Sequence, residues 1–183
     1  KPELIAMRGG RFGIFSPDWK DTTKPWAFHP ISNERTRSPY YHGLGYGDIN
    51  GDGRIDLLEM KGWYEAPEKP LEGDVWKFHE YAFSSNKGGA QMLVYDVDGD
   101  GDNDVVTSLS AHSWGLGWHE QVKQDGKIAF KKHVLIPEDK SPNFLGRMVY
   151  LMVTTTFITY INTLLACHLI EKEINKAILS ASQ

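Results

Sequence analysis

The chain carries the stretch Asp48-Ile49-Asn50-Gly51-Asp52-Gly53-Arg54-Ile55-Asp56, here called the first loop. The same pattern returns as Asp96-Val97-Asp98-Gly99-Asp100-Gly101-Asp102-Asn103-Asp104, the second loop. Each loop places Asp or Asn at positions 1, 3, 5 and 9 and glycine at position 6. Side chains at every second residue can turn inward around a cation, and Ca²⁺ takes about six to eight oxygen ligands. Two copies in one register argue against a chance pair of Asp-Gly turns.

We therefore predict a Ca²⁺ site in each loop. Gly53 and Gly101 are expected at positive φ, which lets the chain turn sharply around the ion. At position 7 we expect the main-chain carbonyl, and not the side chain, to face the ion. The predicted metal-binding residues are Asp48, Asn50, Asp52, Arg54 and Asp56 in the first loop, and Asp96, Asp98, Asp100, Asp102 and Asp104 in the second.

An EF-hand is the first alternative, because Glu59 falls at position 12 of the first loop. Three observations argue against it. The equivalent residue of the second loop is Thr107, which cannot act as a bidentate ligand. The segment 40–47 before the first loop holds three glycines and has no helical period. Leu57-Leu58 and Val105-Val106 follow the loops and are typical of buried strands, so each loop is expected to join strand to strand.

Composition restricts the function classes. The 183 residues suffice for one domain with a real core, and the formal net charge is −4, which two bound Ca²⁺ ions would neutralise. Lys and Arg do not cluster, so no nucleic-acid partner is expected. The only cysteine is Cys167, which excludes a disulfide framework. The start Lys1-Pro2-Glu3-Leu4 is not typical of a signal peptide, and we expect a fragment or processed product.

A longer repeat of about 50 residues surrounds the loops. Trp26-Ala27-Phe28-His29 resembles Trp76-Lys77-Phe78-His79, and Gly62-Trp63-Tyr64-Glu65 resembles Gly117-Trp118-His119-Glu120. The pattern predicts an all-β fold of four-stranded antiparallel units, with residues 1–31 supplying the last three strands of an earlier unit. The strands are expected at 43–48, 55–61, 63–65 and 76–82, and again at 91–96, 104–110, 116–121 and 128–135. Such units are typical of β-propeller blades, and a β-solenoid is the alternative. The four tryptophans Trp26, Trp63, Trp76 and Trp118 are expected in the core between units, and His29, His79 and His133 in structural roles.

The segments 47–58 and 95–106 resemble the FG-GAP/VCBS repeat, and the wider pattern over residues 1–146 resembles secreted bacterial propellers built from that repeat. The resemblance implies a ring of about seven blades. It also implies Ca²⁺ in the loops between the first two strands of each blade, and an extracellular or periplasmic location. This chain carries about two and a half blades, so its ring is expected to be incomplete and its open blades to self-associate.

From Arg147 the repeat stops, and we place a domain boundary between residues 1–146 and a tail of residues 147–183. The segment 148–170 is apolar enough to be a marginal membrane span. The alternatives are buried strands or helices, or an end foreign to the fold. The segment 171–179 is expected to be helical.

Two functions from different classes remain open. The first is a binding or scaffold module without enzymatic activity, with a carbohydrate or protein as ligand. The second is a carbohydrate lyase or dehydratase of the propeller type, whose catalytic candidates would be His42 and His112 on the face opposite the loops. The second unit also has seven extra residues around His112 and Trp114, which could stack on a sugar or polar ligand.

Overall fold

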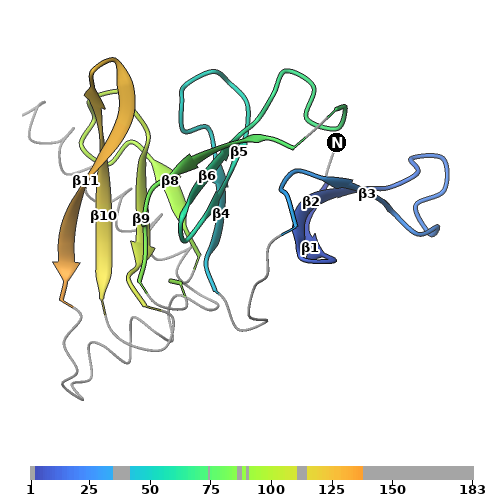
Figure 1. The fold of residues 1–183 in the computed structure, drawn as a ribbon, viewed down its shortest axis with the longest axis horizontal. Helices are drawn as coiled ribbons and strands as arrows, with labels where there is room; N and C mark the ends of the chain where they lie inside the picture. Colours follow the sequence, from blue (N-terminus) through green and yellow to red (C-terminus); the bar gives the residue numbers. More distant parts are fainter. Residues whose placement is uncertain are drawn as a thin grey trace, which may run out of the picture.

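The computed structural model describes residues 3–34, 42–73, 75–85, 88–89, 91–110 and 115–137 (Figure 1). Within these residues the fold is all-β, with eleven strands in three antiparallel sheets. The strands are β1 (Leu4–Arg8), β2 (Arg11–Ser16), β3 (Ala27–Pro30), β4 (Leu44–Gly47), β5 (Asp56–Glu59), β6 (Gly62–Glu65), β7 (Lys77–Glu80), β8 (Leu93–Tyr95), β9 (Asp104–Ser108), β10 (Leu116–Gln124) and β11 (Lys127–Ile136).

Each sheet is a meander of strands that follow one another in sequence. The first sheet has the order β1-β2-β3, the second β4-β5-β6-β7, and the third β8-β9-β10-β11. Every predicted strand corresponds to an observed one, and most are shorter than expected. The two loops join β4 to β5 and β8 to β9, so the expected strand-to-strand connection is confirmed.

The hairpin of β10 and β11 is longer than predicted, since the expected strands covered only 116–121 and 128–135. Its turn is Asp125-Gly126, with φ of 50° and 73°. Two consecutive residues at positive φ match the twist of antiparallel strands and allow the tightest hairpin turn. The Asp-Gly pair was the sequence signal for this extension.

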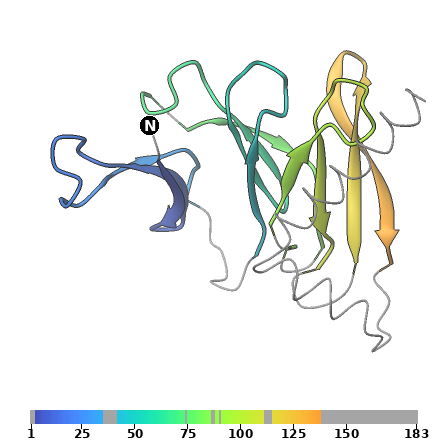
Figure 2. The same ribbon diagram turned by 180° about the vertical axis from the view of Figure 1, so that it is seen from behind.

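The three sheets lie side by side, with the second between the other two in both views (Figures 1 and 2). Two apolar cores fill the interfaces. The core between the first and second sheets contains Phe12, Ile14, Ile31, Leu57, Tyr64, Ala66 and Trp76. The core between the second and third sheets contains Ile49, Leu58, Trp63, Phe83, Met92 and Val105.

Strands β4 and β8 approach each other very closely across the second interface. A Cβ atom added to Gly45 would lie 2.6 Å from the Cβ of Met92, and one added to Gly47 would lie 2.4 Å from the Cβ of Val94. Gly45 and Met92 also form an isolated parallel bridge. Glycine is therefore required at both positions for this packing.

The tryptophans divide into two groups. Trp63 and Trp76 are buried in the cores, as predicted. Trp26 and Trp118 are only half-buried and belong to neither core, so the prediction is wrong for them. Trp118 lies on the outer face of the third sheet, where the described part of the chain provides no further sheet. A residue that is core in a central sheet becomes surface in a terminal one.

Several predictions fall on residues outside the described ranges. These are the tail 147–183 and the loop that holds His112 and Trp114. Among the residues that are described, no helix is long and apolar enough to cross a membrane. The candidate span 148–170 was not part of that search.

Candidate metal centre

Backbone conformation sets the shape of both loops. Gly51 and Gly53 have φ of 74° and 82°, and Gly99 and Gly101 have φ of 80° and 95°. The expected positive φ at position 6 is thus confirmed, and position 4 shares it. No atom lies within 4 Å of a Cβ built on any of the four, so glycine serves the turn itself and not close packing.

The aspartate at position 1 organises each loop from its centre. In the first loop, Asp48 accepts hydrogen bonds from the main-chain N–H groups of Gly51 at 2.8 Å, Asp52 at 3.1 Å and Gly53 at 2.8 Å. In the second loop, Asp96 accepts from Gly99 at 2.7 Å and Gly101 at 3.2 Å. The chain therefore curls around this carboxylate in the same way in both sheets.

The second loop brings three predicted ligands together. Asp96, Asp98 and Asp100 each present a carboxylate oxygen, and these oxygens lie within 4.8 Å of one another. Three carboxylates at this range suit a hard divalent cation, because oxygen ligands on a flexible loop are what Ca²⁺ prefers. Asp102 and Asp104 do not belong to this group. Asp102 instead lies 3.3 Å from the Lys123 Nζ.

The first loop differs at two positions. Asn50 replaces one carboxylate, and its side-chain amide donates to Asp52 Oδ2 at 2.8 Å. The guanidinium of Arg54 also pairs with Asp52 Oδ2, and its Nε donates to the carbonyl of Ala66 at 2.8 Å. The sequence analysis gave Arg54 only a main-chain role. Its side chain places a cation at the loop, where the second loop has the acidic Asp102.

The position 9 aspartates are buried and tie each loop to a later strand. The carboxylate of Asp56 accepts from the main-chain N–H of Ile49 at 2.9 Å and of Ala66 at 2.8 Å. Asp104 accepts the equivalent bonds from Val97 at 3.1 Å and Gln121 at 2.8 Å, and a third from the Trp118 indole at 2.9 Å. The sequence analysis treated both residues only as metal ligands and missed this structural role.

Burial dominates the acidity of these two carboxyl groups. Desolvation raises the pKa of Asp56 to about 6, against the opposing effect of the two amide bonds, and the charges of Asp52 and Asp48 add to the rise. Burial likewise raises the pKa of Asp104. A nearby cation would favour the charged form of both groups.

The two loops lie at the same edge of neighbouring sheets and touch (Figure 1). The side-chain amide of Asn103, at position 8 of the second loop, donates to the main-chain carbonyl of Asp48 at 2.7 Å. The corresponding position of the first loop is Ile55, which is exposed.

The histidines on the last strand of each sheet have structural partners, which agrees with the prediction. His79 bonds to Glu65 at 2.7 Å and stacks on Trp63, with ring centres 4.1 Å apart. The hydrogen bond from His79, followed by that from Lys77, lowers the pKa of Glu65. His133 repeats this arrangement with Glu120 and Trp118. His29 bonds to Ser16 at 2.9 Å.

His119 is fully buried where the second and third sheets meet. Its Nδ1 forms a hydrogen bond of 3.0 Å with the Tyr81 hydroxyl, and its ring packs edge-on against Phe83. Burial lowers the pKa of His119 to about 4, and the charge of Lys132 acts in the same direction. The expected packing role of His119 is thus what the contacts show.

The catalytic and ligand-binding candidates are not brought together within the described residues. His42 is exposed just before β4, and its main-chain oxygen lies against Gly88, where an added Cβ would come within 1.8 Å. His112 and Trp114 lie outside the described ranges. Comparisons with protein-family models, curated proteins and solved structures found no match to this chain.

Proposed function

We propose that the chain is a calcium-binding repeat protein of the FG-GAP/VCBS type, and that its three sheets are blades of an incomplete β-propeller. The supporting architecture is the four-stranded meander, in which strands keep their sequence order and sheets pack face to face. The single observation that carries the metal is the convergence of Asp96, Asp98 and Asp100 in a loop whose counterpart occupies the same place in the neighbouring sheet.

In this proposal Ca²⁺ is held by Asp96, Asp98 and Asp100 in the second loop, and by Asp48, Asn50 and Asp52 in the first. The ion neutralises carboxylates that the loop forces together. Because the loops touch through Asn103 and Asp48, binding stiffens one edge of both sheets. The chain would then act as a binding or scaffold module for a carbohydrate or protein, outside the cytoplasm, where Ca²⁺ modules work at about 10⁻⁴–10⁻³ M.

The binding or scaffold function is preferred to a carbohydrate lyase or dehydratase. The enzyme would need His42 and His112 at one site, and the described residues supply only His42. The open faces of the first and third sheets also suit association with a further protein surface, including a second copy.

The test is calorimetric titration of the metal-free chain with CaCl₂, together with thermal melts in EDTA and in millimolar Ca²⁺. We expect one binding event for each loop. Binding to the native state alone adds about 2.7 kcal/mol of stability at a hundredfold excess over Kd. Mg²⁺ is the control, because it demands a tighter octahedral shell. Coincident melting curves in EDTA and Ca²⁺ would refute the proposal.

A further inference from the structure

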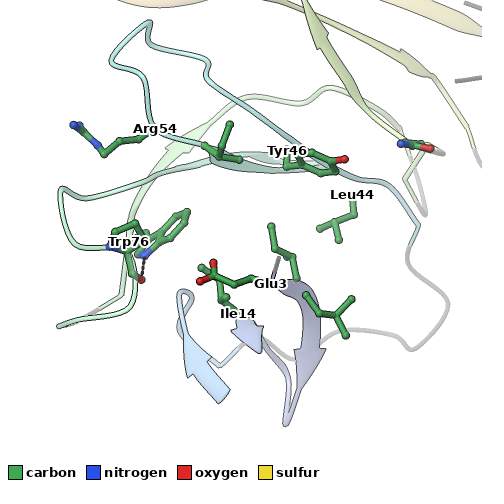
Figure 3. A pocket seen from close by; sticks show the side chains of 11 residues that line it. Glu3, Ile14, Leu44, Tyr46, Arg54 and Trp76 are labelled. Carbon is green, nitrogen blue, oxygen red and sulfur yellow. Dashed lines mark hydrogen bonds between the residues drawn. The ribbon is translucent and has the colours of Figure 1, made fainter. Parts of the chain in front are cut away.

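A cavity of about 740 Å³ lies between the first and second sheets (Figure 3). Its walls are mainly apolar and include Leu4, Ile5, Ile14, Leu44, Tyr46 and Ile55. In Figure 3 the first sheet, with Ile14, forms one side, and Leu44 and Tyr46 on β4 form the other. No comparable cavity is recorded between the second and third sheets in the described part of the chain.

The cavity lies beside a strand edge that is paired in the other two sheets. Ile5 on β1 faces Ile14 on β2 in the same register as Leu58 on β5 faces Trp63 on β6. Strand β1 is thus the counterpart of β5, which pairs with β4 on its other side. Among the described residues, no strand pairs with that side of β1. The first sheet therefore lacks the counterpart of β4.

The second interface shows what such a strand does. There, β4 presents Gly45 and Gly47 to Met92 and Val94 of the next sheet. The residue after the strand and its aspartate, Ile49, is fully buried in the core beside Leu58 and Trp63. One innermost strand therefore contributes two glycines and one aliphatic side chain to the interface.

The cavity walls match this contribution. Aligning the two loops at position 1 makes Leu44 the counterpart of Met92, and Tyr46 the counterpart of Val94. Met92 is covered and 2% exposed, whereas Tyr46 is 64% exposed on the cavity wall. Ile5 and Ile14 correspond to the residues that pack against Ile49. The surfaces that would receive a strand are present without one.

We propose that this cavity is a docking site for one extended peptide strand, supplied by another polypeptide. The strand pairs antiparallel with β1, presents glycines to Leu44 and Tyr46, and places an aliphatic residue against Ile5 and Ile14. This is β-strand addition, in which main-chain bonds give affinity and alternate side chains give specificity. The inference rests on the repeat architecture of the proposed function and not on the metal.

The probe is a labelled peptide with the sequence of residues 43–50, Gly-Leu-Gly-Tyr-Gly-Asp-Ile-Asn, titrated against the full chain by fluorescence anisotropy. We expect saturable binding at one peptide per chain. A peptide with valine at the places of Gly45 and Gly47 should bind at least tenfold more weakly, because its Cβ atoms would meet the cavity wall at about the separations seen across β4 and β8. Hydrogen exchange should show new protection on β1.

Two chain variants make the test specific. Tyr46→Lys alters an exposed wall residue and should weaken peptide binding at least fivefold. Leu135→Lys is the matched control on β11, since Leu135 is 52% exposed at the far end of the molecule, and it should leave binding unchanged. A circular dichroism melt of each variant checks that the fold is retained.

Equal binding of the glycine and valine peptides, or protection on β11 in place of β1, would overturn the proposal. So would absence of binding at millimolar peptide. Concentration-dependent dimerisation that the peptide cannot reverse would assign the cavity to a second copy and reject a separate strand. Calcium titration is read independently, so loss of peptide binding with intact Ca²⁺ binding refutes only the docking site, and the reverse refutes only the metal.

Discussion

The side-chain amide of Asn103 donates a hydrogen bond of 2.7 Å to the main-chain carbonyl of Asp48, which joins the two loops across 55 residues of sequence. Asp48 is the residue around which the first loop curls. The second loop therefore helps to fix the first, and the two sites are expected to be coupled energetically.

Replacement of Asn103 by Ala tests this coupling. We expect a loss of about 1 kcal/mol of stability, the usual net value of one hydrogen bond, and a several-fold weaker Ca²⁺ affinity for the first loop. Calorimetric titration measures both sites. Ile55→Ala, at the equivalent position of the first loop, is the control and should leave the isotherm unchanged. Superimposable isotherms for Asn103→Ala and the parent would show that the contact carries no coupling.

Arg54 is expected to lower the Ca²⁺ affinity of the first loop, because its guanidinium already pairs with Asp52. Arg54→Ala should raise that affinity a few-fold, in line with about 0.2–1 kcal/mol for an exposed ion pair. The gain should shrink as salt increases. Lys123→Ala, which frees Asp102, is the matched variant of the second loop. An unchanged or weaker first site in Arg54→Ala at low salt would contradict this expectation.

Asp56 and Asp98 should respond in opposite ways when Ca²⁺ is removed. Asp56→Asn offers only one acceptor oxygen to the N–H groups of Ile49 and Ala66, so it should lose about 1–3 kcal/mol even in EDTA. Asp98→Asn removes one of three crowded charges and should be neutral or stabilising in EDTA. It should also lose the stabilisation by Ca²⁺ at the second loop.

Thermal melts with and without Ca²⁺ distinguish the two roles. If Asp56→Asn melts like the parent in EDTA, the structural role of this carboxylate is wrong. If Asp98→Asn melts lower than the parent in EDTA, the carboxylate cluster is held together by something other than a cation.

His119 should make the chain less stable in mild acid. The folded-state pKa of about 4 lies below the ordinary 6.5, so the unfolded chain binds the proton more readily. Stability is then fully present above pH 6.5 and is lost as pH falls toward 4, by an amount on the order of 3 kcal/mol. His119→Phe cannot titrate and should flatten this part of the profile.

The measurement is urea unfolding in EDTA between pH 7 and pH 4.5 for both proteins. The raised pKa of Asp56 acts in the opposite direction, giving stability at low pH that is lost as pH rises toward 6. Because Asp56 is present in both proteins, its contribution cancels in the comparison. Parallel profiles for the parent and His119→Phe would exclude His119 as the source.

The sequence by itself determined the loops and the strands that they join. Alternating Asp and Asn with glycine at position 6 is local chemistry, since φ preferences and charge repulsion act between residues a few positions apart. The positive φ of Gly53 and Gly101 and the meander order of the strands follow from such local terms. The same reasoning placed His79 and His133 in structural roles.

Only the tertiary structure decided which distant groups each side chain meets. Asp56 turns to the amide of Ala66, Asn103 reaches Asp48, and Trp118 is left on an outer face, because these contacts depend on how strands and sheets pack. The cavity beside β1 arises in the same way, from a strand edge that has a partner in two sheets and none among the described residues of the first. Burial and pairing across long sequence separations are properties of the packed chain, which no short pattern of residues encodes.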